Sequence, residues 1–368
     1  MTLEGINLKK LVIVTRCLTS GGAERVVSEI AKYAVENGIS CSIIMTDDRE
    51  IFYKTDESIK LYTIGEISDN KILNRYLKYK KVRNIVKEIN PDIVLTLPED
   101  IGIYVIPAML GSKIPVVVSE RNNPWVMPYT KISRTLRKLF YPCASGYIFQ
   151  TKMASSFFSK KIQKKGIVLP NPLALANIPD AFSGVRNKEV VSTGRLDNQK
   201  NFKLLMDAFK IFHETHPDYT LTIFGEGGQR EELENYAREM LPDGVWKMPG
   251  RDNKWLEKAK TAGMFVLSSD FEGMPNALIE AMATGIPSIS TDCPSGGSAD
   301  LIENEINGIL VPVKDKEKMA EAMCKIADDA NFAHNLSKAA QKIKEDLTIE
   351  KVGKQWISYL EEVNETIN

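Results

Sequence analysis

The 368-residue chain lacks several features that would assign it to a common class of protein. Its five cysteines are scattered and form no Cys-x-x-Cys pair, which argues against zinc and favours a reducing compartment. No run of about 18 apolar residues occurs, so we expect no membrane-spanning helix. The first apolar run, Leu11–Val14, is too short for a signal peptide and follows Glu4, so we expect a cytoplasmic protein.

Three chemical motifs are also missing. There is no Gly-x-Gly-x-x-Gly loop, which disfavours a nicotinamide-dependent oxidoreductase. There is no Asp-x-Asp triplet either, and lysine and arginine side chains can supply the positive charge that a diphosphate needs, so we expect no metal. The three histidines, His213, His216 and His334, all lie in the second half of the chain.

Charge is balanced overall and unbalanced between the halves. Residues 1–187 contain 27 lysines and arginines against 17 acidic residues, and residues 188–368 contain 21 against 31. The basic residues of the first half are concentrated in three groups: Lys71, Arg75, Lys78, Lys80, Lys81, Arg83 and Lys87; Arg134, Arg137 and Lys138; Lys160, Lys161, Lys164 and Lys165.

These basic groups predict attachment to an anionic membrane surface, since leucine and aromatic neighbours would add shallow insertion. The alternative is a set of ordinary solvated helix faces. Nucleic acid is disfavoured as a partner, because only Tyr76 and Tyr79 are interleaved with the first group.

Short apolar runs alternate with amphipathic stretches along the chain. Strands are predicted at Leu11–Thr15, Ile93–Thr96, Val116–Ser119, Tyr147–Gln150, Val190–Gly194, Leu221–Phe224, Met264–Ser268 and Ser288–Thr291. Helices are predicted at 23–37, 73–89, 131–140, 201–214, 229–241 and 276–284, and then at 315–329, 332–345 and 349–367. This alternation is typical of doubly wound parallel α/β sheets.

The chain is too long for one compact core, and two domains are expected. The prolines and asparagine of Leu169-Pro170-Asn171-Pro172 make a good linker, so we place the boundary near 171. The predicted domains are residues 1–170 and 171–348. The last helix, 349–367, is long enough to pack elsewhere than on its own sheet.

The segment Phe271–Met282 is the most informative motif. Gly273 and Pro275 break the chain after Glu272, and Asn276 can cap a helix that carries Glu280. Backbone N–H groups at such a helix start favour an anion, and two flanking carboxylates suit sugar hydroxyls. The alternative is a helix with one capping and one solvated glutamate.

Other candidate residues follow predicted strands. Arg195 and Lys200 can neutralise a diphosphate, and Glu226 and Arg251 lie after neighbouring strands. Gly21 and Gly22 form a glycine pair between a strand and a helix in the first half, where they are equally explained by a tight turn. Each signal is weak alone, but the carboxyl ends of parallel strands meet at one edge of a sheet, where ligands bind.

The combination of Gly194-Arg195-Leu196, Lys200 and the Glu272-x7-Glu280 frame resembles the retaining glycosyltransferases of family 4, and Gly21-Gly22-Ala23-Glu24 is similar to their first glycine loop. The resemblance covers nearly the whole chain. It implies two facing Rossmann-like domains, the B-type glycosyltransferase fold, with the final helix (349–368) crossing back to the acceptor-binding first domain.

The resemblance also implies residue roles. Arg195 and Lys200 would hold the diphosphate of a nucleotide sugar, Glu280 the ribose, and Glu272 a hydroxyl of the donor sugar. The backbone of Gly273, Met274, Pro275 and Asn276 would surround the sugar and phosphates, with Glu226 and Arg251 near the nucleotide. Gly21 and Gly22 would line the catalytic cleft.

One departure concerns a histidine that many family members place after a first-domain strand. Here Val116–Ser119 leads into Glu120-Arg121-Asn122-Asn123. We expect Glu120 or Asn122 to take the histidine position, either shaping the cleft or binding the acceptor. The alternative is a purely structural turn at Glu120-Arg121. This segment looks like a branch that acts on amino-sugar-containing polysaccharides and lipid-linked oligosaccharides.

The resulting hypothesis is a retaining hexosyltransferase that moves a hexose or N-acetylhexosamine from a UDP-sugar to a glycan acceptor at the cytoplasmic face of a membrane. We expect this acceptor to be linked to polyprenyl diphosphate. Two alternatives remain: a non-catalytic sugar-nucleotide-binding subunit and a sugar-nucleotide epimerase of the same architecture.

Overall fold

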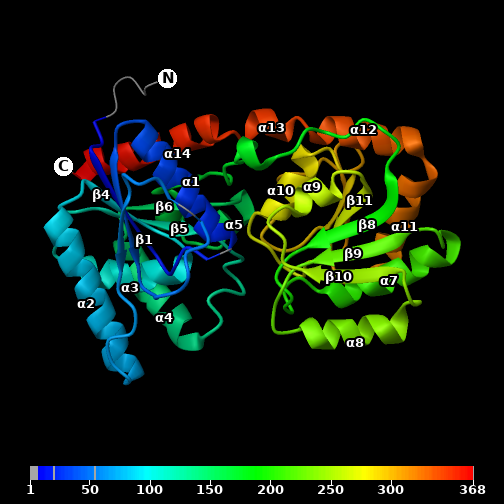
Figure 1. Cartoon of the computed structure of the whole chain (residues 1–368). Helices are drawn as coiled ribbons and strands as arrows, with labels where there is room; N and C mark the ends of the chain where they lie inside the picture. Colours follow the sequence, from blue (N-terminus) through cyan, green and yellow to red (C-terminus); the bar gives the residue numbers. More distant parts are fainter. Residues whose placement is uncertain (1–6, 20, 54, 368) are drawn as a thin grey trace. The chain divides into compact units, whose positions relative to one another are not determined.

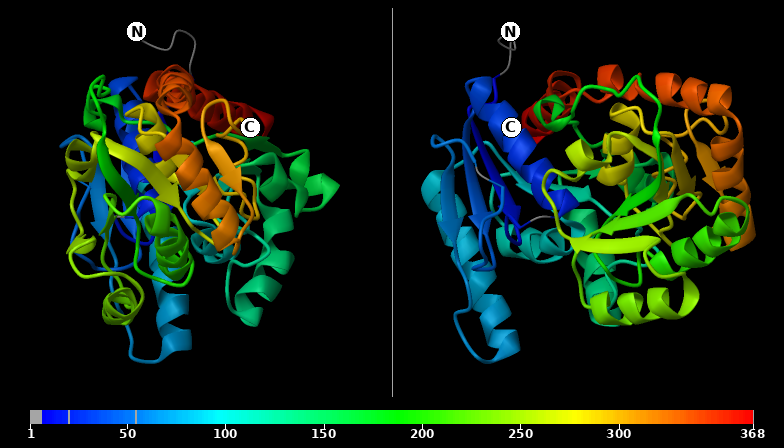
Figure 2. Two further views of the ribbon diagram at one scale, coloured as in Figure 1. Left: turned by 90° about the vertical axis from the view of Figure 1, so that its right-hand side faces the viewer. Right: turned by 45° about the vertical axis from the view of Figure 1, so that its right-hand side comes forward.

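The computed structural model describes residues 7–19, 21–53 and 55–367, so Glu4 and Ser20 lie outside the described residues. The chain forms two compact units (Figures 1 and 2). The first contains residues 1–172 and 347–368, and the second contains residues 173–346. The chain therefore leaves the first unit after Pro172 and returns to it at Leu347, close to the predicted boundary near 171 and the predicted start of the last helix.

The first unit is built on a parallel sheet in the order β3-β2-β1-β4-β5-β6-β7. Its strands are β1 (Lys10–Thr15), β2 (Ser40–Met45), β3 (Lys60–Thr63), β4 (Ile93–Thr96), β5 (Val116–Glu120), β6 (Gly146–Phe149) and β7 (Gly166–Val168). The central strands are buried on both faces, as expected for a sheet that is covered by helices on each side.

Its helices are α1 (Gly22–Glu36), α2 (Lys71–Ile89), α3 (Glu99–Met109), α4 (Lys131–Phe140), α5 (Lys152–Ser156), α6 (Lys160–Gln163) and α14 (Ile349–Ile367), with a 3₁₀ turn at Tyr141–Cys143. Helices α1 and α14 lie side by side on one face, and α2, α3 and α4 cover the other (Figure 1). Gly353 of α14 lies against the ring of Tyr33, so the two helices approach closely.

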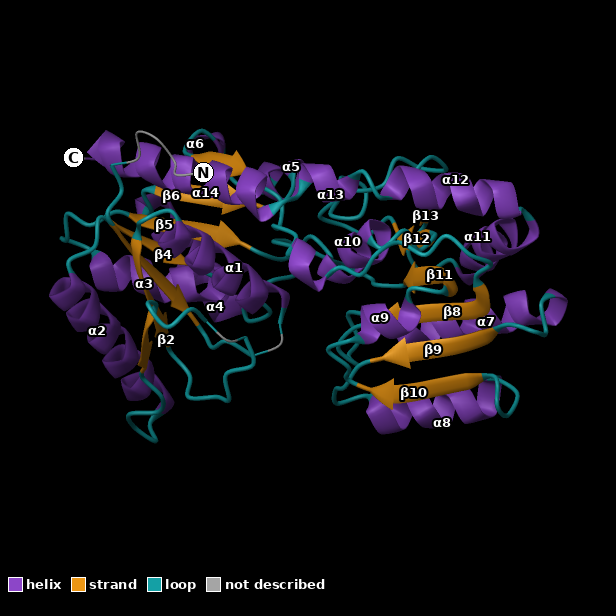
Figure 3. Cartoon of the chain, turned by 45° about the horizontal axis from the view of Figure 1, so that its top comes forward, coloured by secondary structure: helices purple, strands orange, loops and turns teal. Residues whose placement is uncertain are grey.

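The second unit has a parallel sheet in the order β10-β9-β8-β11-β12-β13 (Figure 3). Its strands are β8 (Asn187–Thr193), β9 (Thr220–Phe224), β10 (Trp246–Gly250), β11 (Ala262–Leu267), β12 (Ser288–Thr291) and β13 (Ile309–Val311). Its helices are α7 (Phe202–Thr215), α8 (Arg230–Met240), α9 (Trp255–Ala259), α10 (Asn276–Ala283), α11 (Lys316–Asp328), α12 (Ala330–Ala340) and α13 (Ile343–Asp346), with a 3₁₀ turn at Leu175–Asn177.

The predicted α/β class, with two doubly wound parallel sheets and a last helix that returns to the first unit, is confirmed. One predicted helix, 332–345, is instead two, because the chain turns after Ala340 and resumes as α13. Among the residues that the structure describes, no helix is both long and apolar enough to cross a membrane.

Candidate functional site

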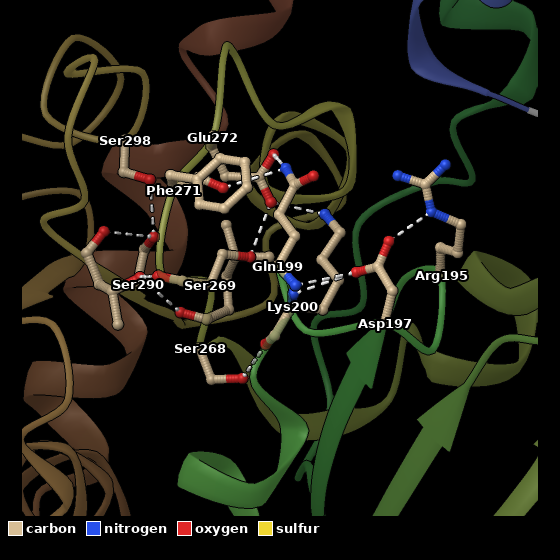
Figure 4. A network of polar contacts seen from close by, with 12 residues as sticks. Arg195, Asp197, Gln199, Lys200, Ser268, Ser269, Phe271, Glu272, Ser290 and Ser298 are labelled. Atoms are coloured by element: carbon tan, nitrogen blue, oxygen red, sulfur yellow. Dashed lines mark hydrogen bonds and ion pairs between the residues drawn. The ribbon is translucent and has the colours of Figure 1, made fainter. Parts of the chain in front are cut away.

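The loops that follow β8, β11 and β12 converge at the carboxyl edge of the second sheet (Figure 4). This edge is where doubly wound sheets bind ligands, and β8 and β11 flank the point where the strand order reverses. The loops are joined directly: Asn201 Nδ2 donates to Asp270 Oδ1 at 2.8 Å, and Ser268 Oγ donates to the carbonyl oxygen of Lys200 at 2.8 Å. The edge is therefore a connected surface rather than a set of independent loops.

Two glycines allow these loops to pack at backbone distance. A Cβ on Gly225, whose φ is +154°, would lie 1.9 Å from the carbonyl oxygen of Gly194. A Cβ on Gly297 would lie 1.6 Å from the carbonyl oxygen of Gly273. No larger residue fits at either position without moving the backbone of a neighbouring loop.

Lys200 and Glu272 form the central interaction of this edge. Lys200 Nζ lies 2.6 Å from Glu272 Oε1, and the two side chains are only 16% and 8% exposed. Ser269 Oγ donates to the same carboxylate oxygen at 2.7 Å. The sequence placed both residues at the edge, and the structure adds that a buried ion pair connects them.

Arg195 has a different environment. Its Nε donates to Asp197 Oδ2 at 2.5 Å, and its side chain is 70% exposed. Figure 4 shows the two terminal nitrogens pointing away from Asp197, so the fork of the guanidinium can receive an anion. Asp197 also accepts hydrogen bonds from the backbone N–H groups of Gln199 and Lys200. These bonds fix the loop from Arg195 to Lys200.

Gln199, which was not predicted as a site residue, is buried between these loops. Its amide nitrogen donates to the carbonyl oxygen of Phe271 at 3.0 Å and to Glu272 Oε2 at 3.4 Å. Glu272 is thus held from one side by Lys200 and Ser269 and from the other by Gln199. The only sequence feature that pointed to Gln199 was its position next to Lys200.

The loop after β12 contacts the backbone of Glu272. Ser295, at φ +86°, donates its hydroxyl to the carbonyl oxygen of Glu272. Burial, with the carboxylate of Glu272 nearby, raises the pKa of the Cys293 thiol to about 12. Cys293 is therefore a neutral, buried packing residue, and the glycine-rich segment after it shapes the site through its backbone.

Helix α10 begins at Asn276, with Pro275 at the N-cap position. The prediction that Asn276 caps this helix was wrong: the carbonyl oxygen of Pro275 accepts from the N–H groups of Leu278 and Ile279, and Asn276 is already the first helical residue. Glu280 lies inside the helix and is buried. Gly273 and Met274 are buried in the turn that leads into it.

Glu226 and Arg251 follow β9 and β10 and are both exposed. Glu226 pairs with Arg230 of α8 at 2.7 Å and lies close to Gly250. In the described part of the chain, no hydrogen bond or ion pair joins either residue to Lys200 or Glu272, although both occupy the same edge of the sheet, nearer its β10 end.

In the first unit, Gly21 and Gly22 lie at the start of α1, at the carboxyl end of β1. A Cβ on Gly21 would lie 2.0 Å from Glu24 Oε2, so the Glu24 side chain folds back over the helix start. The missing side chain of Gly21 therefore allows this acidic side chain to approach the backbone.

Glu120 ends β5 and is only 2% exposed. Its carboxylate accepts from the hydroxyl of Tyr141 at 3.0 Å and from Arg137 Nη1 at 3.4 Å. Burial and the neighbouring carboxylate of Glu99 raise the pKa of Glu120 to about 8. Both oxygens of Glu120 face the interior of the first unit, so this geometry favours neither direct contact with an acceptor nor a surface role for the carboxylate.

Arg121, the next residue, has the structural role that was the alternative for this segment. Its guanidinium donates to Asn171 Oδ1 and to Ser119 Oγ and lies 5.4 Å from the ring centre of Trp356. Burial lowers the pKa of Arg121 to about 9. The side chain therefore connects the end of β5 to the linker and to the terminal helix α14.

Two family models match the chain in succession. Residues 20–176 match the model described as Glycosyltransferase Family 4, and residues 178–343 match the model described as Glycosyl transferases group 1. The junction between the two matches lies within five residues of the point where the first unit ends at Pro172.

Similar proteins align over most of their length. An α-1,4-N-acetyl-D-galactosaminyltransferase of Campylobacter jejuni, named for a diphospho-undecaprenol-linked glycan, is 28% identical over 97% of the chain and 99% of its own. An Escherichia coli UDP-Gal:α-D-GlcNAc-diphosphoundecaprenol α-1,3-galactosyltransferase is 25% identical over 84% of the chain and 85% of its own length. The sucrose-phosphate synthase structure from Thermosynechococcus elongatus superposes with a TM-score of 0.84 at 16% identity, covering 97% of the chain and 100% of its own.

Proposed function

Because the chain belongs to the group 1 and family 4 glycosyltransferases, enzymes that share its two-unit B-type fold, we propose that it transfers an N-acetylhexosamine or hexose from a UDP-sugar to a hydroxyl of a polyprenyl-diphosphate-linked glycan, with retention of configuration. The observation that carries the proposal is the buried Lys200–Glu272 pair beside the exposed guanidinium of Arg195. Two cations and an ordered carboxylate at one sheet edge match the charge and hydroxyl pattern of a nucleotide sugar.

The donor lies in the second unit in this proposal. Arg195 and Lys200 neutralise the diphosphate, Glu272 accepts from a sugar hydroxyl, and Glu280 holds the ribose. The backbone turn from Gly273 to Asn276 surrounds the sugar and phosphates, and Glu226 and Arg251 lie toward the nucleotide. Lys200 is held at 2.6 Å from Glu272, so one preordered pair serves the leaving group and the sugar together.

Transfer proceeds by attack of the acceptor hydroxyl on the anomeric carbon from the face that the diphosphate leaves. The transition state resembles an oxocarbenium ion, and negative charge grows on the leaving diphosphate. Fixed cations stabilise that charge best when they need no reorganisation, and removing one such donor costs about 10²–10³-fold in rate. Arg195 and Lys200 supply this charge, so we propose that no metal is required and that a chelator leaves the rate unchanged.

The acceptor side of the proposal draws on the names of the relatives. The Campylobacter jejuni and Escherichia coli enzymes are both named for sugars linked to undecaprenyl diphosphate. An acceptor of that kind lies at a membrane, and we propose that the first unit attaches peripherally to the cytoplasmic, anionic surface.

The basic residues of the first unit support membrane attachment only in part. Lys78 and Arg137 are not surface charges as the sequence suggested: Lys78 is buried and pairs with Glu66 at 2.7 Å, and Arg137 is buried and donates to the carbonyl oxygens of Met127 and Pro124. The remaining lysines of α4, Lys131 and Lys138, are exposed.

Exposed apolar side chains lie among these lysines. Ile132 and Leu139 of α4 are 69% and 62% exposed, and Trp125 and Tyr129 of the preceding loop are also exposed. We call these four side chains and Lys131 and Lys138 the α4 surface. Apolar and aromatic side chains flanked by lysines favour shallow insertion into an anionic bilayer.

Flotation with vesicles tests this attachment. We expect binding to vesicles that contain anionic lipid, little binding to zwitterionic vesicles, and loss of binding in Ile132→Ser/Leu139→Ser. The matched control is Val185→Ser/Ile306→Ser, which removes two exposed apolar side chains from the second unit. Equal flotation of all three proteins at low salt contradicts the proposed surface.

The donor is tested by thermal stabilisation with UDP and a panel of UDP-sugars, followed by transfer to a diphosphate-linked disaccharide acceptor. A ligand at about 100 times its Kd stabilises the folded state by about 2.7 kcal/mol, which is readily measured. Binding without transfer or donor hydrolysis would favour the non-catalytic subunit, and interconversion of UDP-sugars would favour the epimerase. The stereochemistry of the product tests retention.

A further inference from the structure

The carboxamide of Gln199 is fixed in one orientation (Figure 4). Its nitrogen donates both to the carbonyl oxygen of Phe271 and to Glu272 Oε2. Both partners can only accept hydrogen bonds when Glu272 is ionised, so the nitrogen rather than the oxygen of the amide must face them. The amide oxygen, Gln199 Oε1, therefore points to the other side of the same group.

That oxygen is available to a ligand. Among the described residues it accepts no hydrogen bond, and it is not one of the buried polar atoms left unpaired, although Gln199 as a whole is only 9% exposed. It therefore reaches solvent through a small opening. An acceptor that is fixed in place and nearly buried is suited to an N–H or O–H group of a bound molecule.

The carboxylate of Glu272 can also accept a further hydrogen bond. Its Oε1 accepts from Lys200 and Ser269, and among the described residues its Oε2 accepts only from Gln199. A carboxylate has about four lone-pair positions, so one position on Oε2 remains for a ligand. It lies next to the amide of Gln199, because the two groups are hydrogen-bonded to one another.

We propose that Gln199 determines specificity for the donor sugar: Gln199 Oε1 and Glu272 Oε2 together accept from two neighbouring donor groups on one sugar ring. The ligand class is a hexose with adjacent hydroxyls, or an acetamido sugar with an N–H beside a hydroxyl. This inference rests on the proposed function and adds a sugar-reading residue to it. A sugar that lacks one of the two donors leaves a nearly buried acceptor unpaired, and such sites reject the wrong ligand strongly.

Adjacent donors on ring positions 2 to 4 always include position 3. The test therefore measures binding and transfer with UDP, UDP-N-acetylgalactosamine and its 3-deoxy form. The wild-type protein is expected to lose about 10–100-fold in kcat/KM with the 3-deoxy donor, because one hydrogen bond to a nearly buried acceptor is missing. Affinity for UDP alone supplies the reference that does not involve the sugar.

The variant Gln199→Met keeps the length of the side chain and removes both of its hydrogen-bonding atoms. It is expected to bind UDP within about twofold of the wild type and to lose most of the discrimination against the 3-deoxy donor. The control is Gln341→Met, the same change at a glutamine of the second unit whose nitrogen donates to the carbonyl oxygen of Ser337. This control is expected to match the wild type with every donor.

Two results overturn the inference while leaving the proposed function intact: wild-type protein that uses the 3-deoxy donor equally well, or Gln199→Met that discriminates as the wild type does. The first result needs no variant and holds even if Gln199→Met folds poorly. Wild-type protein that binds neither UDP nor UDP-N-acetylgalactosamine overturns the proposed function, and the inference with it.

Discussion

Lys200 and Glu272 come from loops 72 residues apart in sequence, and their charged groups meet at 2.6 Å with little access to water. An ion pair in this setting constrains both partners, because moving either one leaves the other charge buried and uncompensated. The contribution of the pair to stability can therefore be measured separately from its proposed role in transfer.

Replacing Lys200 with methionine should lower the free energy of unfolding by about 3–5 kcal/mol, since it leaves the carboxylate of Glu272 buried without its cation. The double variant Lys200→Met/Glu272→Gln should recover most of that loss in urea denaturation and should still transfer sugar at least about 10²–10³-fold more slowly than the wild type, because it also lacks the carboxylate of Glu272.

The control for this pair is Lys203→Met, which breaks the exposed ion pair with Glu232 in the same unit and should cost no more than about 1 kcal/mol. If Lys200→Met and Lys203→Met have equal free energies of unfolding, the Lys200–Glu272 pair contributes no more to stability than an exposed ion pair does.

Replacing Glu280 with alanine should weaken UDP binding by roughly tenfold or more, because a hydrogen bond to an ionised group contributes about 1.5–3 kcal/mol. Isothermal titration with UDP measures the change, and Glu321→Ala, at an exposed position of α11, is the control. Folded Glu280→Ala protein with wild-type UDP affinity would remove Glu280 from the proposed nucleotide site.

Since Glu272 contacts the sugar in the proposed arrangement, Glu272→Ala should instead abolish transfer and leave UDP affinity nearly unchanged.

The stability of the first unit should fall as pH rises. Burial raises the pKa of Glu120 to about 8 and that of Glu99 to about 7, both from 4.5, so the folded state retains protons that the unfolded chain releases. The unfolded state then binds fewer protons between about pH 4.5 and pH 8, and the free energy of unfolding decreases through that window.

Glu120→Gln keeps the shape of the side chain and cannot ionise, so its melting temperature should vary less with pH than that of the wild type across the same window. Glu36→Gln, on the exposed end of α1, should retain the full wild-type dependence. If the wild type and Glu120→Gln have parallel pH profiles, Glu120 is not the group that titrates.

Replacing Arg121 with alanine should destabilise the first unit by about 2–4 kcal/mol, because it removes a buried hydrogen-bonding network around Asn171. Hydrogen exchange should then speed up at the end of β5, in the linker and along α14. UDP affinity should persist, since the proposed nucleotide site is in the other unit. Lys113→Ala, at an exposed position near β5, is the control, and equal exchange in both variants would show that Arg121 does not connect these segments.

The sequence was sufficient to predict most of the architecture, because buried parallel strands such as β4 read as short apolar runs and the alternation with helices is regular. It was insufficient where local signals conflict. Helix α3 contains Gly102 and Pro107, which hide its period, and β3 is a short, mostly exposed edge strand with little apolar pattern. Both elements were missed.

The candidate site shows the same division. Arg195, Lys200 and Glu272 could be placed at one sheet edge because each follows a strand. The contacts of Gln199 and Ser295 depend on the tertiary approach of three loops, for which spacing gives no signal. The burial of charged side chains could not be predicted either. Lys78 and Arg137 were interpreted as surface charges, and Glu120 as a cleft residue, because a sequence does not show which side of a helix or strand end faces the core.

The return of α14 to the first unit affects the order in which the protein is completed during synthesis. Residues 173–346 are contiguous, so the second unit can fold as soon as they leave the ribosome. The first unit lacks the partners of Tyr33, Gly146 and Arg121 until Gly353, Tyr359 and Trp356 emerge, after the whole of the second unit. The first unit is therefore completed only after the second, and its nascent form exposes the apolar surface that α14 later covers.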